Sequence, residues 1–137
     1  EIDLQPFHYQ QLQQGTDITL DSGKVLENDA YTLPPSPPMK YAYCSDTAYF
    51  EPLVPLIKEV DLLYHEATFL EKNNTLAAKT KHSTAKQAAQ IAKMANVKQL
   101  MVGHFSNRYP NKEDFISEAS GIFKNVILAK DLKTFKI

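Results

Sequence analysis

Four short apolar segments recur along the second part of the chain, and their spacing constrains the fold more than any other feature. They are residues 41–44, 62–64, 100–102 and 126–128, each of strand length. Stretches with helical periodicity separate them. Because strands that alternate with helices usually form a parallel sheet with right-handed crossovers, we predict an α/β fold with a mainly parallel sheet and flanking helices.

Three segments between these strands carry helical stripes. In the first, Pro52 and Pro55 fall in the expected first turn, where a missing amide hydrogen does little harm. The second has a narrow face of small residues, which lets a helix lie close to a sheet, and Ser83 or Thr84 is expected to cap its start. The stripes are Leu53, Leu56, Ile57 and Val60; Ala85, Ala88, Ala89, Ala92 and Ala95; and Phe115, Ile116, Ala119, Ile122 and Phe123.

Residues 1–39 differ from the rest and are expected to form an arm and connector. They hold five of the eight prolines, four of them in the stiff stretch 34–38. Within the arm, residues 17–20 and 24–26 read as two short strands joined by a turn that contains Gly23, which predicts a small hairpin. Residues 40–137 form the second unit.

Composition sets few limits on the partner. The net charge of −1 gives no overall basic field, so contact with nucleic acid requires a local patch or a part of the protein outside this sequence. The lone Cys44 excludes an internal disulfide and fits a reducing compartment, so we expect a cytoplasmic protein and a small buried side chain. No apolar run approaches the ~20 residues of a membrane span. The start at Glu1 is neither a signal peptide nor an initiator methionine, which suggests a cut end.

Polar residues follow two of the apolar segments. Asp46 comes after residues 41–44, and His104 comes after residues 100–102 and Gly103, which permits close approach by another group. Ligands bind at the carboxyl ends of strands in an open α/β sheet, and carboxylate with imidazole suits zinc. Taken singly, Asp46 is more often a helix cap and His104 more often a structural residue.

Glu66 and His82 form a second candidate pair. Glu66 follows the second apolar segment, and His82 opens the alanine-rich helix. A carboxylate that orients an imidazole improves it as a proton donor or acceptor, as departure of an alkoxide from phosphorus requires. The alternative is a surface loop with a helix cap. Arg108 has two open interpretations, a phosphate contact and a surface side chain.

Four ordered motifs stand out: residues 41–47 (YAYCSDT), 64–69 (YHEATF), 82–89 (HSTAKQAA) and 103–109 (GHFSNRY). Together they closely resemble the carboxyl-terminal half of ribonuclease Z, the tRNA 3′-processing endonuclease of the metallo-β-lactamase superfamily. The resemblance covers about residues 40–137, and residues 12–29 also resemble the segment before the aspartate motif. It implies a partial metallo-β-lactamase fold, half of an αββα sandwich.

The resemblance also implies roles for the candidate residues. Asp46 would bridge two zinc ions, and His104 would be a terminal ligand of one of them. Glu66 and His82 would form the proton-relay pair that assists the leaving 3′ oxygen, and Arg108 would lie close enough to meet a tRNA phosphate. The implied substrate is precursor tRNA, and the intact protein is expected to be a homodimer.

One part of the family pattern does not occur in this sequence. The family carries an H-x-H-x-D-H motif and a further ligand histidine upstream. Without them the chain lacks most zinc ligands and the aspartate that activates the attacking water, so it should not hold two zinc ions tightly. We therefore predict a fragment of a phosphodiesterase, with negligible nuclease activity alone. Two alternatives are a superfamily hydrolase acting on another ester and a non-catalytic α/β binding module.

Overall fold

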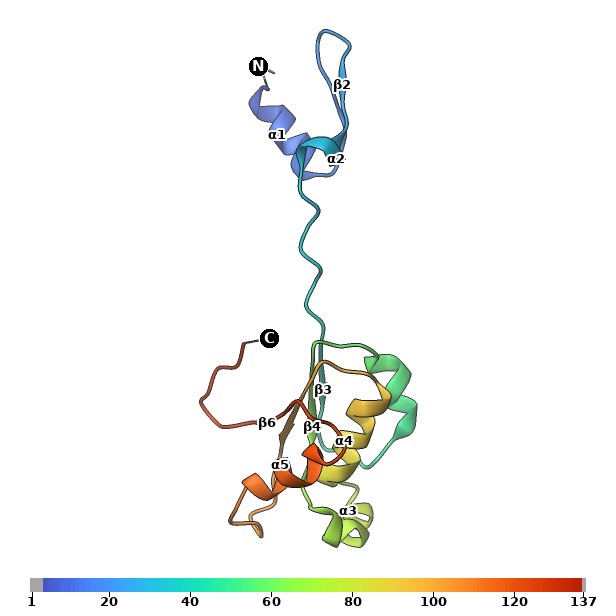
Figure 1. Cartoon of the computed structure of the whole chain (residues 1–137), viewed down its shortest axis with the longest axis vertical. Coiled ribbons are helices and arrows are strands. Elements are labelled where there is room, and N and C mark those ends of the chain that lie inside the picture. Colours follow the sequence, from blue (N-terminus) through green and yellow to red (C-terminus); the bar gives the residue numbers. More distant parts are fainter. Residues whose placement is uncertain (1–3, 137) are drawn as a thin grey trace. The chain divides into compact units, whose positions relative to one another are not determined.

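The computed structural model describes residues 4–136, and the chain divides into two compact units at Pro38 and Met39 (Figure 1). Unit 1 comprises residues 1–38 and unit 2 comprises residues 39–137. The sequence predicts an arm over residues 1–39 and a larger unit over residues 40–137. Residues 1–3 of the arm and residue 137 of the larger unit lie outside the described residues. No helix within residues 4–136 has the length and apolar character needed to span a membrane.

Unit 1 is a helix and a hairpin around a small apolar core. Its elements are α1 (Pro6–Gln13), β1 (Ile18–Thr19), β2 (Val25–Leu26) and α2 (Asn28–Tyr31). The two strands pair antiparallel across a turn in which Gly23 has a φ of 77°, a left-handed conformation that glycine adopts without steric cost. Leu12, Ile18 and Leu26 are buried together, and the Asn28 side chain donates to the Leu12 carbonyl at 2.7 Å. A single polar side chain thus ties the hairpin exit to α1.

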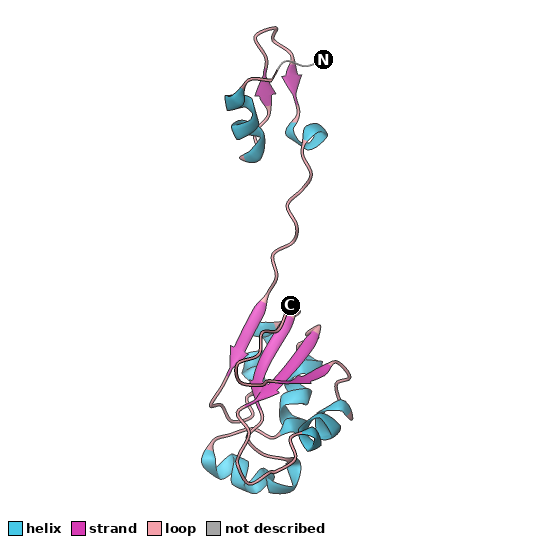
Figure 2. Cartoon of the chain, turned by 90° about the vertical axis from the view of Figure 1, so that its left-hand side faces the viewer, coloured by secondary structure: helices cyan, strands magenta, loops and turns pink. Residues whose placement is uncertain are grey.

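Unit 2 is built on one four-stranded sheet. Its strands are β3 (Tyr41–Cys44), β4 (Leu62–Glu66), β5 (Gln99–Gly103) and β6 (Val126–Leu128), in the order β3-β4-β5-β6. All three neighbouring pairs are parallel (Figure 2). The α/β fold with a parallel sheet is confirmed, and the carboxyl ends of all four strands point to the same edge.

Helices α4 (Ala85–Met94) and α5 (Glu113–Ser120) pack on this sheet, α4 against β4 and β5 and α5 against β6 (Figure 1). The other helical segments of unit 2 are η1 (Glu51–Ile57), η2 (Glu71–Asn73) and α3 (Asn74–Thr80). The five alanines of the predicted small-residue face are fully buried, which confirms that α4 lies close against the strands. Thr84 is its cap, because its side-chain hydroxyl accepts from the Gln87 backbone N–H and its own backbone N–H donates to Gln87 Oε1.

Two predicted stripes differ from the observed helices. The segment around Leu53 forms the 3₁₀ helix η1, since an α-helix would place the ring of Pro55 against the carbonyl four residues earlier. The predicted stripe is wrong at Leu56, which is 80% exposed, whereas Ile57 and Val60 are buried and Val60 lies beyond the end of η1. The third stripe outlasts its helix, because α5 ends at Ser120 and the last two apolar residues follow in a turn.

The close approach expected at Gly103 is confirmed. A Cβ atom at this position would lie 2.5 Å from the Tyr64 hydroxyl oxygen, so the ring of Tyr64 occupies the space that a side chain would need. Tyr64 also stacks on Tyr43, with ring centroids 4.5 Å apart. These contacts fix the end of β5, where the next residue is His104.

Candidate functional site

Three candidate residues converge at the carboxyl edge of the sheet. Glu66 is the last residue of β4, His104 directly follows β5, and Asp46 lies two residues beyond β3. Asp46 and His104 have φ values of 49° and 60°, a left-handed conformation that costs a non-glycine residue about 1–2 kcal/mol. Surrounding contacts must hold both residues there, and such strain is common at functional sites.

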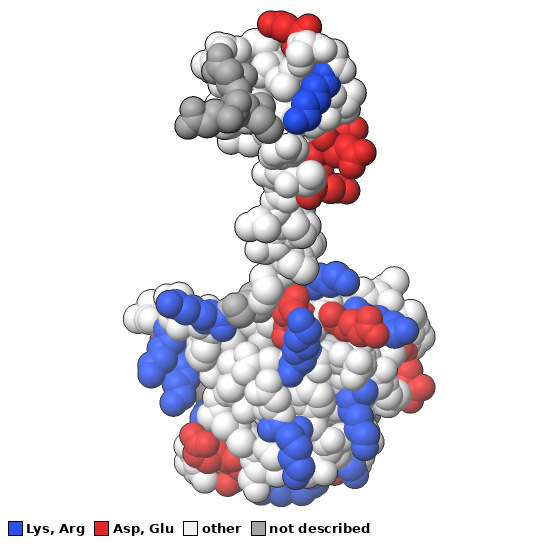
Figure 3. All heavy atoms as spheres, turned by 45° about the horizontal axis from the view of Figure 1, so that its top comes forward, with Lys and Arg blue, Asp and Glu red and all other residues white. Residues whose placement is uncertain are grey.

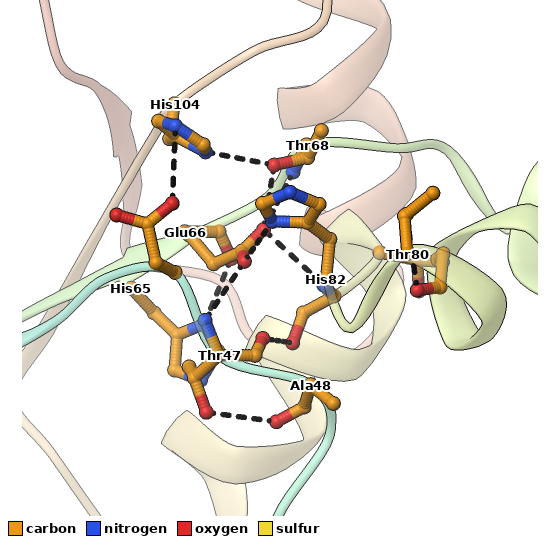
Figure 4. A network of polar contacts seen from close by, with 12 residues as sticks. Thr47, Ala48, His65, Glu66, Thr68, Thr80, His82 and His104 are labelled. Carbon is orange, nitrogen blue, oxygen red and sulfur yellow. Dashed lines mark hydrogen bonds and ion pairs between the residues drawn. The ribbon is translucent and has the colours of Figure 1, made fainter.

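Glu66 is the centre of the polar network (Figure 4). Its carboxylate is fully buried and accepts backbone N–H bonds from Thr47 at 3.0 Å, Thr68 at 3.1 Å and Ser83 at 3.2 Å. Two side chains also donate to it, the Thr68 hydroxyl at 2.7 Å and His82 Nδ1 at 2.7 Å. The carboxylate therefore joins the ends of β3 and β4 to the loop before α4.

The hydrogen bonds decide the charge of Glu66. Burial raises the pKa of this carboxyl, but the bonds from Thr68, His82 and Ser83 outweigh burial and hold the pKa below its ordinary value. Since hydrogen bonds to a carboxylate favour its ionised form, Glu66 carries its negative charge at neutral pH. A charged acceptor strengthens each bond that it receives.

Asp46, His82 and His104 form a group that can hold a metal ion. One donor atom from each residue lies within 4.8 Å of the others. His104 Nε2 and Asp46 Oδ1 are 3.4 Å apart, close to the separation of about 3.4 Å between ligands that lie 2.0–2.1 Å from a tetrahedral zinc. The His82 and His104 rings have centroids 5.3 Å apart. Two imidazoles and a carboxylate fit zinc in chemistry, and the Asp46–His104 spacing fits it in geometry.

The helix-cap alternative for Asp46 is wrong, because the next helix is η1 and its N-cap is Phe50. The predicted cap of α4 is confirmed, since Thr84, one of the two expected residues, forms it. This cap does not exclude a role for His82, which contacts Glu66 as the sequence predicted. The sequence did not predict His82 among the possible metal ligands.

Arg108 is linked to the site through Phe69. Its guanidinium sits over the Phe69 ring, 5.3 Å from the centroid, and its Nε donates to Ser106 Oγ at 3.2 Å. The same Phe69 ring is 6.2 Å from the His82 ring. Arg108 and His82 therefore share one aromatic neighbour, and the role of Arg108 as a phosphate contact stays a prediction.

Sequence reasoning missed the threonine and serine partners of Glu66. Thr47, Thr68 and Ser83 belong to the quoted motifs, but the sequence predicts no role for the two threonines and only a possible helix cap for Ser83. A hydroxyl residue two positions after an acidic strand end is the one signal that pointed to Thr68. Cys44 is half-buried against the core, and burial raises the pKa of its thiol, as suits a packing residue.

His65 makes the stability of unit 2 pH-dependent. Its ring is fully buried, its Nδ1 lies 2.7 Å from the Glu66 carbonyl oxygen, and its Nε2 has no hydrogen-bond partner within residues 4–136. Burial lowers the pKa of His65 below 6.5, although the Glu66 carbonyl and carboxylate oppose the shift. Below pH 6.5 the unfolded chain therefore binds a proton that the folded chain does not.

We expect the free energy of unfolding to fall as the pH drops from 6.5 towards the lowered pKa, with a slope of up to about 1.4 kcal/mol per pH unit. Urea unfolding across this range measures the slope. His65→Asn keeps a donor near the position of Nδ1 but does not titrate, so this variant should lose that part of the slope. An identical slope in both proteins would contradict the assignment to His65.

The chain is similar in sequence to known proteins. Residues 14–105 match the family described as the β-lactamase superfamily domain. The chain is 47% identical over 118 residues to ribonuclease Z of Porphyromonas gingivalis, which covers 86% of the chain and 39% of that protein. It is also 47% identical to ribonuclease Z of Cytophaga hutchinsonii, over 98% of the chain and 44% of that protein.

A solved structure is similar in fold. The metallo-β-lactamase fold protein YhfI from Bacillus subtilis superposes with a TM-score of 0.62 at 25% identity, over 66% of this chain and 37% of that one. The chain thus spans well under half the length of the curated relatives that it matches.

Proposed function

The chain belongs to the β-lactamase superfamily and is a homologue of ribonuclease Z, and from this premise we propose that it is part of a zinc-dependent endoribonuclease that processes the 3′ end of precursor tRNA. One observation carries the proposal. The hydrogen-bonded pair Glu66–His82 lies beside a metal-binding group that includes Asp46 and His104. A proton donor next to metal ligands is what cleavage of a phosphodiester needs.

Each residue has a stated role in this proposal. Asp46 and His104 would hold zinc, and a zinc ion bound there would polarise the phosphodiester and lower the pKa of a water molecule. Glu66 accepts a hydrogen bond from His82 Nδ1–H and so orients that ring, which leaves Nε2 as the nitrogen available for proton transfer. His82, once protonated, donates to the 3′ oxygen as it leaves phosphorus. The ionised Glu66 stabilises the positive charge that His82 carries at that stage.

Charge in unit 2 supports an RNA substrate. Residues 39–137 carry fourteen Lys and Arg against ten Asp and Glu, a net charge of +4. The net charge of the whole chain is −1 because unit 1 is acidic. Basic side chains spread over the face of unit 2 seen in Figure 3. A cavity of about 480 Å³ beside His104 is lined by Asn107, Lys112 and Lys130 among others. With Arg108, these groups offer cations and an amide to phosphate oxygens.

We also propose that the active enzyme contains a further metal motif upstream. Support comes from the short span of the chain, 39% and 44% of the two curated relatives, and from the lack of H-x-H-x-D-H in the sequence. We expect this longer protein to be a homodimer. Its mass in solution tests this expectation, and the mass of a monomer would contradict it.

Cleavage of precursor tRNA tests the proposal. The protein encoded by this sequence together with the reading frame upstream of Glu1 should cleave a 3′-extended precursor tRNA, whereas the 137-residue chain alone should leave it uncut. Robust cleavage by the chain alone would contradict the fragment assignment. If the longer protein hydrolyses another ester and precursor tRNA does not compete, the substrate assignment is wrong and the other superfamily hydrolase is favoured.

A further inference from the structure

The hydroxyl group of Thr68 lies between two functional side chains. Its Oγ1 is 2.7 Å from Glu66 Oε2 and 2.9 Å from His104 Nδ1 (Figure 4). Thr68 is 7% exposed, so water does not readily replace either partner. One hydroxyl thus connects the buried carboxylate to an imidazole of the metal-binding group.

The number of protons in this contact fixes its direction. A threonine hydroxyl has one proton to donate, and the ionised Glu66 has none. If Thr68 donated to His104 Nδ1, two oxygen atoms 2.7 Å apart would face each other without a proton between them. Since a short bond to a carboxylate is the stronger of the two, Thr68 donates to Glu66 and accepts from His104 Nδ1–H.

The Glu66 carboxylate fixes the tautomer of the second imidazole, that of His82, by a direct hydrogen bond. His82 Nδ1 lies 2.7 Å from Glu66 Oε1, so this nitrogen also carries the proton. In their neutral forms, both rings therefore present an unprotonated Nε2. His104 Nε2 is 3.4 Å from Asp46 Oδ1, which is longer than an ordinary N–H···O bond of 2.7–3.2 Å, so this contact does not draw the proton to Nε2.

We propose that Thr68 is a positioning residue that fixes His104 in the Nδ1–H tautomer and so leaves its Nε2 free to bind a divalent cation. Glu66 then holds both imidazoles in the Nδ1–H tautomer, His82 by a direct hydrogen bond and His104 through the Thr68 hydroxyl. The cation's part in catalysis rests on the function proposed above, but the tautomer depends only on the residues of this chain. Bonds from the second ring nitrogen are the usual means by which proteins orient a histidine ligand.

The tautomer of His104 is the first measurement. Two-bond ¹H–¹⁵N correlation spectra of the full chain with ¹⁵N-labelled histidine distinguish the two neutral tautomers from each other and from the protonated ring. We expect Nδ1–H for His104 in the wild-type chain and in Thr68→Ser, which keeps the hydroxyl. Thr68→Val removes it and should shift His104 towards Nε2–H. His82 should keep Nδ1–H in all three proteins.

A matched control separates this role from general destabilisation. Thr80→Val removes a hydroxyl that bonds the Leu76 carbonyl within α3, and it should leave the His104 signal unchanged. An Nε2–H tautomer in the wild-type chain would overturn the proposal, as would the same tautomer in the wild type and Thr68→Val. The wild-type and Thr68→Ser spectra decide the matter even if Thr68→Val does not fold.

Zinc binding is the second measurement. Competition with a chromophoric chelator should show weaker zinc binding by about tenfold in Thr68→Val and near wild-type binding in Thr68→Ser. Equal affinity in wild type and Thr68→Val would overturn the link to the cation. A protein that shows the tautomer shift but never cleaves precursor tRNA would refute the proposed function and leave the role of Thr68 standing.

Discussion

Replacing Glu66 by alanine is expected to lower the free energy of unfolding of unit 2 by about 3–5 kcal/mol, because five donors lose a charged acceptor and each buried donor left unsatisfied costs about 1–3 kcal/mol before the structure relaxes. The substitution leaves three backbone N–H groups, the Thr68 hydroxyl and His82 Nδ1 without their acceptor in a buried place. Each unsatisfied donor costs desolvation energy. The substitution also removes the side chain that links β3, β4 and the loop before α4. Urea unfolding followed by NMR signals of unit 2 measures the change.

Two further variants define the cause. Glu113→Ala removes an exposed carboxylate from the first turn of α5 and should change stability by about 0.5 kcal/mol or less. Glu66→Gln keeps the shape of the side chain but turns an amide NH₂ towards a donor, so it should fall between the wild type and Glu66→Ala. If Glu66→Ala unfolds at the same urea concentration as the wild type, the carboxylate does not organise the site.

The contribution of the Glu66 carboxylate to stability should depend on pH in the acidic range. Because the pKa of folded Glu66 lies below 4.5, its ionised form stabilises the fold above the unfolded pKa, and this contribution disappears as the pH falls through the lowered folded value. Glu66→Ala should therefore lose stability in acid less steeply than the wild type. The Glu66 effect lies below the range where His65 acts, so the two can be measured separately.

The sheet and its functional edge could be predicted because both depend on local pattern. Parallel strands buried on both faces read as continuous apolar runs, as β4 and β5 do. Residues just past such runs gather at one edge by geometry alone, which brought Asp46, Glu66 and His104 together. The tight contact of α4 followed from its alanines, since small side chains permit close packing.

Other features depend on contacts that the sequence does not specify. Most donors to Glu66 are backbone amides, which nearly every residue has, so only the folded loops show which of them converge. Residues 51–57 form a 3₁₀ helix rather than an α-helix because of the steric clash that Pro55 would cause, and the spacing of apolar residues gives no information on this clash. The membership of His82 in the metal-binding group depends on the distances from the loop before α4 to the loops after β3 and β5, which the sequence does not specify.

His82→Ala in the longer protein is expected to lower kcat for precursor tRNA by about 10²–10⁴-fold, the range for loss of a general acid, with a smaller change in KM. The reason is geometric. Glu66 holds the ring by Nδ1 and directs Nε2 to the group formed with Asp46 and His104, so the ring lies where the 3′ oxygen would leave. Lys81→Ala, which removes the adjacent exposed cation, is the control for lost charge and should retain most of kcat.

A change of leaving group separates proton donation from metal binding by His82. A precursor tRNA with sulfur in place of the 3′ oxygen needs no proton for departure, because a thiolate is a far better leaving group than an alkoxide. If His82 donates the proton, His82→Ala should cleave this substrate at nearly the wild-type rate and retain its zinc. If His82 is instead a ligand, the variant should lose zinc and remain slow on both substrates, and the proton-relay assignment would then be wrong.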